Sequence, residues 1–126
     1  MRPELDELLC KKYPLLYADR DAPTNVTNMC WGFPGDGWYE IINRLSKRLE
    51  RAIEALPEEE RQHYRAAQVK EKFGTLRFYM TASTDEMEEW IAEAEKDSAV
   101  TCEDCGAPGE LRGGGWLRTL CSEHAK

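Results

Sequence analysis

Three cysteines and one histidine near the C-terminus are the residues of this sequence best suited to chemistry. They form a CxxC pair and a CxxH pair separated by fifteen residues, and they are Cys102, Cys105, Cys121 and His124. Two residues between the members of a pair let one tight turn point both side chains at a common centre, and Gly106 permits the backbone to curl around it. Thiolates and imidazole at this spacing are typical zinc ligands, so the sequence predicts a Zn²⁺ site.

The number of ligands decides the kind of zinc site that is expected. Catalytic zinc keeps one position open for water, whereas three cysteines and a histidine fill the tetrahedron. We therefore predict structural zinc, because a zinc hydrolase or deaminase would require an open position. The alternatives to a metal site are unligated thiols or a redox-active dithiol, and the paired spacing disfavours both.

The fifteen residues between the two pairs predict a β-hairpin. Gly113–Gly115 can turn between Glu110–Arg112 and Trp116–Leu120, which would bring the second pair of ligands to the first. This arrangement is typical of a zinc ribbon or a truncated treble clef. We predict a zinc-binding module over 101–126, packed as one compact unit on a core over 1–100. A closed zinc site contributes about 10 kcal/mol or more of metal-linked folding free energy, which so short a segment needs.

Hydrophobic periodicity predicts the elements of the core. Apolar residues at helical spacing predict a short helix over 3–12, a central helix from an Asp36 N-cap to about Leu56, and a short helical turn after Pro57. A Ser83/Glu86 capping box starts a further helix that runs to about Asp97. A change to period two over 67–80 predicts a β-hairpin that turns near Phe73–Gly74. The fold class is therefore α+β, with amphipathic helices packed on a β-hairpin.

The two faces of the predicted hairpin differ in chemistry. One face is apolar and expected to be buried, and it carries Val69, Phe73, Leu76, Phe78 and Met80. Glu71 falls on this apolar face, so it must pair with a cation or mark a local bulge. The opposite face is basic and aromatic, and it carries Lys70, Lys72, Arg77 and Tyr79. The preceding segment 14–37 is rich in turn formers, and we expect an ordered loop that packs Trp31, Phe33 and Trp38 on the core.

Charge is unevenly distributed along the 126 residues, whose net charge is −7. Residues 61–80 carry a net charge of +4, between −4 over residues 1–60 and −7 over residues 81–126. An acidic chain is unsuited to generic binding of nucleic acid or anionic membrane. The basic hairpin face, with Arg61 and Arg65 nearby, could still contact phosphates and stack a base. The simpler interpretation is a solvated face.

Several function classes find no support in the sequence. No apolar run approaches the roughly 20 residues that span a bilayer, and the N-terminus lacks the layout of a signal peptide. We therefore expect no membrane partner and a cytoplasmic location, where thiols stay reduced. Cys10 is expected to be buried, and Cys30 to be a buried or, less favourably, a reactive thiol. His63 lies in a charged stretch without a cysteine or serine partner nearby and is expected at the surface. Nothing in the sequence resembles a complete triad or paired catalytic carboxylates, so we predict a protein that is not an enzyme.

Three sequence elements resemble a family of small proteins encoded by bacteriophages and prophages, for which no activity is established. These elements are Trp31–Phe33 with Gly35–Trp38, the segment QVKEKFGTLRFY over Gln68–Tyr79, and the Cys/His pairs around Gly-Gly-Trp. The resemblance implies a phage context in a bacterial host cell and a zinc-bearing C-terminus, and it transfers no catalytic residues.

Together, these observations lead to two function hypotheses. The first is a zinc-binding, non-enzymatic protein-interaction module that acts on a host or phage protein, for example as an inhibitor of a host defence or regulatory protein. The alternative is a nucleic-acid-binding zinc protein that uses the basic face of the hairpin within 61–80. The two differ in salt response, because binding to phosphates weakens steeply with salt.

Overall fold

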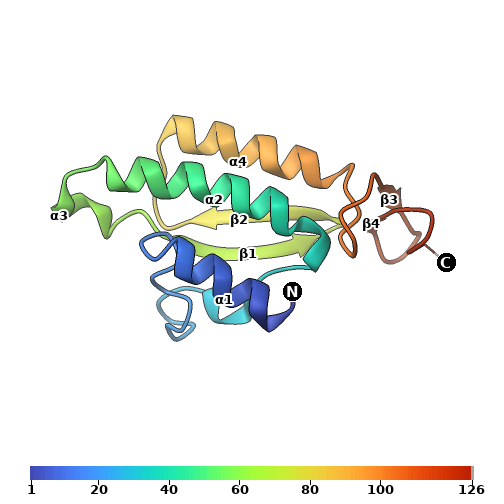
Figure 1. Cartoon of the computed structure of the whole chain (residues 1–126), viewed down its shortest axis with the longest axis horizontal. Helices are drawn as coiled ribbons and strands as arrows, with labels where there is room; N and C mark the ends of the chain where they lie inside the picture. The colour runs from blue at the N-terminus through green and yellow to red at the C-terminus, as the bar shows by residue number, and fades with distance from the viewer. Residues whose placement is uncertain (126) are drawn as a thin grey trace.

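Helices alternate along the chain with two short antiparallel hairpins. The computed structural model describes residues 1–125 (Figure 1). Its α-helices are α1 (Pro3–Lys12), α2 (Tyr39–Glu54), α3 (Glu58–Arg61) and α4 (Asp85–Ser98), and its 3-10 turns are η1 (Met29–Trp31) and η2 (Asp36–Trp38). The strands pair as β1–β2 (Ala66–Lys72 with Thr75–Met80) and β3–β4 (Glu110–Arg112 with Arg118–Leu120). This combination confirms the predicted α+β class.

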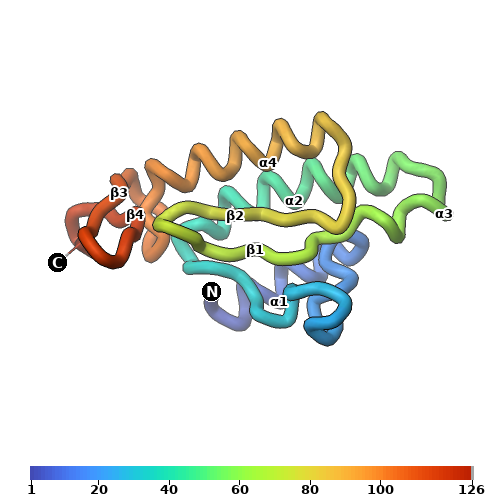
Figure 2. The backbone as a smooth tube through the Cα atoms, turned by 180° about the vertical axis from the view of Figure 1, so that it is seen from behind, coloured from blue at the N-terminus to red at the C-terminus, as the bar shows by residue number. Residues whose placement is uncertain are grey.

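The helices cover one face of the β1–β2 hairpin. Figure 1 shows α2 and α4 side by side and running in opposite directions, with α1 next to α2 and with β3–β4 at one end of the molecule. Seen from behind in Figure 2, the hairpin lies in front of α2, and α4 runs alongside β2. Apolar residues at helical spacing face the hairpin, so that Leu49, Ile53 and Met87 are buried together with Leu76 of β2. No helix within residues 1–125 is long and apolar enough to cross a membrane.

The β1–β2 register puts the predicted residues on opposite faces, with one exception at the turn. Val69 pairs with Phe78, and Lys70 pairs with Arg77. Phe73 was expected on the buried face but is 67% exposed, because it occupies the turn with a φ of 55°. A turn in which Phe73 and Gly74 both have positive φ matches the twist of a hairpin, and it points the Phe73 side chain outward.

Contrary to expectation, Glu71 forms no ion pair with any cation of residues 1–125 and does not mark a bulge. Its Oε2 accepts a hydrogen bond of 2.7 Å from the Gly74 amide and so stabilises the turn. The irregularity in the register lies instead between Ala66 and Gln68. The hydrogen bond to the turn thus explains why a carboxylate lies on the apolar face.

Two side chains of α4 accept hydrogen bonds from backbone amides along the outer edge of β2. The Leu76 amide donates to Ser98 Oγ at 2.9 Å, and the Phe78 amide donates to Glu95 Oε2 at 3.0 Å. An unpaired strand edge otherwise exposes backbone groups that invite pairing with another chain. These two bonds therefore protect the edge and fix α4 against the hairpin.

Two helix starts differ from those predicted. The α2 helix begins at Tyr39, because the Asp36 carboxylate accepts from the Arg2 amide at 2.7 Å and pairs with its guanidinium at 3.0 Å instead of capping the helix. The N-cap of α4 is Thr84, whose Oγ1 accepts from the Met87 amide at 3.2 Å. Ser83 donates to Glu88 instead, so the cap lies one residue later than expected.

The loop before α2 is ordered on the core, as expected, but buries only part of its aromatic content. Trp38 is fully buried, and the Phe33 ring meets the Tyr17 ring edge-on with centroids 5.0 Å apart. Trp31, in contrast, is 72% exposed. The 3-10 turn η1 has three residues per turn and Met29 points into the core. Trp31, two positions later, therefore points in a different direction.

Candidate metal centre

The first pair of cysteines lies in a tight loop that follows α4. The Cys102 amide donates to the Ala107 carbonyl at 2.8 Å, and the Gly106 amide donates to the Cys102 carbonyl at 2.9 Å. Gly106 has a φ of 83°, which favours glycine over other residues. The loop therefore curls back on itself and presents both thiols on its inner side.

The β3–β4 hairpin brings the second pair of ligands to this loop. Its strands lie within the predicted hairpin, although β4 begins at Arg118, so that Trp116 belongs to the turn. The Glu103 amide donates to the Thr119 carbonyl at 3.0 Å, which holds β4 beside the first loop. Directly after β4, the Ala125 amide donates to the Cys121 carbonyl and closes a turn that carries His124.

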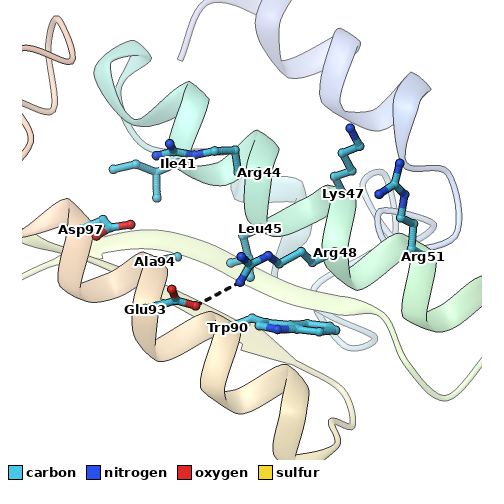
Figure 3. A pocket seen from close by; sticks show the side chains of 10 residues that line it. All are labelled: Ile41, Arg44, Leu45, Lys47, Arg48, Arg51, Trp90, Glu93, Ala94 and Asp97. Atoms are coloured by element: carbon cyan, nitrogen blue, oxygen red, sulfur yellow. Dashed lines mark hydrogen bonds and ion pairs between the residues drawn. The ribbon is translucent and has the colours of Figure 1, made fainter.

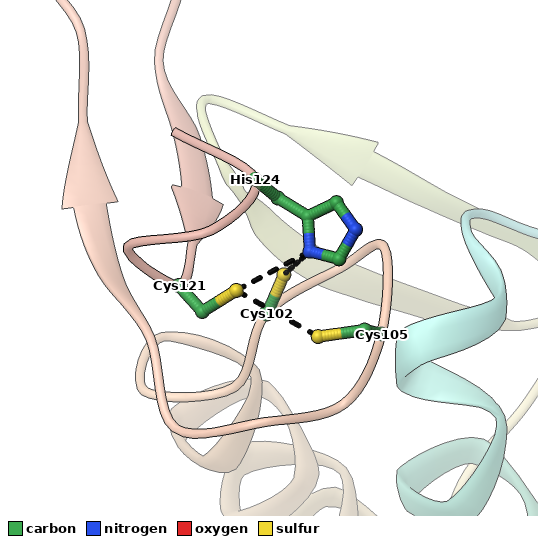
Figure 4. A group of neighbouring side chains, drawn as sticks. All are labelled: Cys102, Cys105, Cys121 and His124. Atoms are coloured by element: carbon green, nitrogen blue, oxygen red, sulfur yellow. Dashed lines mark hydrogen bonds between the residues drawn. The ribbon is translucent and has the colours of Figure 1, made fainter. Parts of the chain in front are cut away.

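The four predicted ligands converge on one point. Figure 4 shows the three thiols and His124 Nδ1 facing one another, and their ligand atoms all lie within 4.8 Å of each other. The Cys105 and Cys121 sulfurs are 3.7 Å apart, and His124 Nδ1 is 3.2 Å from Cys121 Sγ and 3.7 Å from Cys102 Sγ. A tetrahedral zinc ion gives edges of about 3.8 Å between sulfurs and about 3.6 Å between sulfur and nitrogen. The spacing therefore fits a tetrahedral metal site.

Backbone amides favour the thiolate form that metal binding requires at Cys102 and Cys121, whereas at Cys105 the amide of Ala107 is outweighed by burial and the neighbouring thiols, which raise the pKa. Burial acts to raise the pKa of Cys102, but hydrogen bonds from nearby backbone amides, that of Cys121 foremost, outweigh it and lower the pKa. The amide of His124 is the main cause of a lowered pKa at Cys121. Anionic sulfur is the form that binds a metal. Because four protein side chains complete the tetrahedron, the site is suited to hold a metal ion structurally.

The GDGW segment before α2 forms the surface on which the metal-binding loop rests. The Gly37 amide donates to the Glu103 carbonyl at 2.7 Å, and the Trp38 indole donates to the Thr101 carbonyl at 2.8 Å. A Cβ atom added at Gly37 would lie 2.1 Å from the Cys102 carbonyl oxygen. Only glycine allows this close approach, so the segment and the metal loop fit backbone against backbone.

The turn of the β1–β2 hairpin forms a second contact with the metal-binding segment. Thr119 Oγ1, which is fully buried, donates to the Gly74 carbonyl at 2.7 Å. A Cβ atom added at Gly74 would lie 2.4 Å from Cδ1 of Leu111 in β3. The GDGW segment, the turn of the β1–β2 hairpin and the segment that carries the Cys/His pairs therefore meet at one junction.

The predicted basic face is present, but its neighbours are engaged elsewhere. Lys70, Lys72, Arg77 and Tyr79 share one face of the hairpin, with Lys70 directly opposite Arg77. Arg77 lies 4.0 Å from Glu95 of α4. Arg65 pairs with Asp19 at 3.0 Å, and Arg61 donates to two backbone carbonyls, so neither extends the basic face freely.

The remaining thiols and His63 lie outside the metal centre. Cys10 is half-buried, and burial together with nearby Asp6 raises its pKa to about 11, which makes it a poor nucleophile. Cys30 is exposed, in contrast to the buried position that was favoured. His63 is exposed, as expected for a surface residue.

Comparison with known proteins identified no relative of this chain. A search of family models, curated proteins and solved structures gave no significant match to the chain. Fold and site alone therefore define its class, a small α+β protein with a Cys₃His cluster suited to a metal ion.

Sequence reasoning located the ligands but missed the residues that position them. Gly35 and Gly37 fall in the predicted loop over 14–37 and Thr119 falls in a predicted hairpin, and neither prediction connects them with the ligands. The glycines themselves are the available signal, because glycine is favoured where one backbone segment approaches another closely. What the sequence could not supply was the identity of the segment that approaches.

Proposed function

We propose that this chain is a zinc-binding, non-enzymatic protein-interaction module that acts in a bacterial cell on a host or phage protein, such as a host defence or regulatory protein that it inhibits. The choice of zinc rests on the donor set, because three thiolates with one imidazole suit zinc better than the oxygen-preferring cations. The phage context rests on the sequence resemblance.

Exposed apolar side chains at the metal-bearing end carry the proposal of protein binding. Phe73 is 67% exposed, Leu111 50% and Trp116 77%. Leu111 touches the turn that carries Phe73, and Trp116 lies in the turn of the adjacent hairpin. Large apolar side chains gathered in this way are typical of binding surfaces. The metal ion would hold β3–β4 in the position that presents them.

Affinity capture from bacterial lysate tests this proposal when it compares two exposed tryptophans. Trp116→Ala should lose the captured partner, whereas Trp31→Ala, which removes a similarly exposed tryptophan on η1, should retain it. Native mass spectrometry of each variant should show one zinc ion per chain, which verifies that the module is intact. Equal capture by both variants, or capture of no protein, would contradict the proposal.

The open face of the β1–β2 hairpin supports nucleic-acid binding as a second candidate. No helix lies in front of this face in Figure 2, and Tyr79 is 44% exposed there beside the opposed cations Lys70 and Arg77. Anisotropy with a single-stranded oligonucleotide should then show affinity that falls steeply with salt. Replacing Lys70, Lys72 and Arg77 together by Ala should abolish it, and Lys11→Ala on α1 should not. Absence of binding at low salt would eliminate this candidate.

A further inference from the structure

The exposed side of α2 carries a row of positive charge in an otherwise acidic part of the chain. Its basic residues recur at i, i+3, i+4 and i+7 and are all exposed: Arg44, Lys47, Arg48 and Arg51. This spacing places them on one side of the helix over a length of about 10 Å. We refer to these four residues as the basic face of α2.

The neighbouring helix α4 carries the opposite charge on its exposed side. A groove of about 390 Å³ separates the two helices, and Glu93 and Asp97 line it from α4. Helical spacing puts Glu86 and Glu89 on the same side of α4, and we refer to these four residues as the acidic face of α4. Figure 3 shows the apolar side chains of the groove between the helices, with Arg48 reaching across to Glu93. Its Nη1 lies 3.0 Å from the Glu93 carboxylate.

Most charges of the two faces have no ion-pair partner within residues 1–125. Across the described chain, the Arg48–Glu93 pair is the ion pair that joins the faces. Arg44, Lys47 and Arg51 make no ion pair among residues 1–125, and neither do the other three carboxylates of the acidic face. Like charges three or four residues apart repel one another. Each face would therefore gain from an external surface of opposite charge.

We propose that two copies of this chain associate through these faces, around a two-fold axis that runs along the groove. Rotation about an axis parallel to the helices stacks α2 of one copy on α4 of the other. The Arg48–Glu93 pair and the groove lining place Arg44 at the level of Asp97. The same rotation preserves these levels, so Arg44 of each copy faces Asp97 of the other. An interface of this kind is self-complementary, as two-fold symmetry requires.

The composition of the groove favours a second copy over a nucleic acid. A polyanion attracted to the basic face would lie against the acidic face about one helix diameter away, and α4 has a single basic residue, Lys96. A suitable occupant must present an acidic row and a basic row side by side. The chain itself presents both rows at the required spacing.

The size of the surface indicates the strength of association. The two helices are 16 and 14 residues long, which corresponds to about 24 and 21 Å. With axes about 10 Å apart, they offer a footprint of about 400 Å² per copy. A total near 800 Å² is at the weak end of protein interfaces. We therefore expect a dimer that forms at high concentration and weakens with salt.

Sedimentation equilibrium of the metal-loaded full chain tests the proposal with a charge-swap pair. The wild type should approach twice the monomer mass as concentration rises at about 0.05 M salt, and the dissociation constant should increase at least about tenfold at about 0.5 M salt. Arg44→Glu/Arg51→Glu and Glu89→Lys/Asp97→Lys should each be monomeric alone. Both leave the Arg48–Glu93 pair in place. An equimolar mixture of the two variants should form a heterodimer.

Restored pairing in the mixture also shows that both variants fold, so a monomeric variant cannot be explained by unfolding. A wild type that stays monomeric at the highest concentration and lowest salt would overturn the proposal. Dimers that persist in both single variants, or variants that fail to pair when mixed, would overturn it as well. The proposal is independent of the surface around Trp116, because loss of capture by Trp116→Ala and loss of dimer by the charge variants report on different faces.

Discussion

The core and the metal-binding segment occupy one short chain but are held together by different forces. The core gathers 18 buried apolar side chains from α1, α2, α4, β1, β2 and the intervening loop. The corresponding cluster of the metal-binding segment contains Cys102, Leu120 and Cys121, two of which are candidate ligands. Backbone contacts with Gly37 and Gly74 connect the two regions. Apolar burial is too small to hold this segment, so close backbone packing takes its place, and coordination would add to it once a metal ion is bound.

Removal of the metal should produce the largest difference in stability between the two regions. A closed zinc site contributes about 10 kcal/mol of folding free energy, whereas the core is stabilised by burial that needs no metal. Hydrogen exchange in the presence of a chelator should therefore show loss of protection over 102–121, with the Leu49 and Leu76 amides still protected. Cys30→Ser, which removes an exposed thiol outside the site, should leave exchange unchanged in the metal-loaded protein. Unaltered protection of 102–121 after metal removal would contradict the comparison.

The same leucine truncation should have unequal effects in the two regions. Leu49 is fully buried, so Leu49→Ala should lower the free energy of unfolding by about 2–5 kcal/mol through the cavity that it leaves. Leu111 is half exposed in β3, and Leu111→Ala should cost under about 1 kcal/mol. Urea unfolding of the two metal-loaded variants measures both values. Equal costs would mean that the metal-binding segment depends on apolar burial after all.

A methyl group at the junction should show how closely the regions fit. Gly37→Ala places a Cβ atom 2.1 Å from the Cys102 carbonyl, so the metal loop must shift, at a cost of about 1–3 kcal/mol. Gly114→Ala in the β3–β4 turn meets no atom within 4 Å and serves as the matched control. Urea unfolding and competition with a chelating dye should show lower stability and weaker metal binding for Gly37→Ala alone. If Gly37→Ala kept the wild-type metal affinity, the metal site would not depend on the close fit at the junction.

Short-range signals in the sequence were sufficient for the elements and the ligands. Periodicity located the helices and the β1–β2 hairpin, and the spacing of Cys102, Cys105, Cys121 and His124 predicted their convergence. Positions that depend on distant segments were not predictable in this way. Asp36 binds Arg2, which is distant in the sequence, instead of capping the helix, and Met29 lies in the core while Trp31 is exposed.

The smallest expected effect is a pH dependence of stability that arises from Glu50, a residue of the core. Burial raises the pKa of this carboxyl above its ordinary value of 4.5, although the amides of Leu15 and Leu16 donate hydrogen bonds to it. A carboxyl with a raised pKa binds a proton more tightly in the folded than in the unfolded chain. Its contribution to stability is therefore complete below pH 4.5 and is lost as the pH rises through the folded-state pKa.

Glu50→Gln removes this titration while it keeps the shape of the side chain. The unfolding free energy of the variant minus that of the wild type should increase as the pH is raised from 4.5 towards neutrality. Metal release in acid affects both proteins alike, so the difference isolates Glu50 from the metal-binding segment. Urea unfolding at a series of pH values measures it. A difference that stays flat or decreases with pH would show that the amides of Leu15 and Leu16 fully compensate the burial of the carboxylate, and that the core tolerates a buried charge without loss of stability.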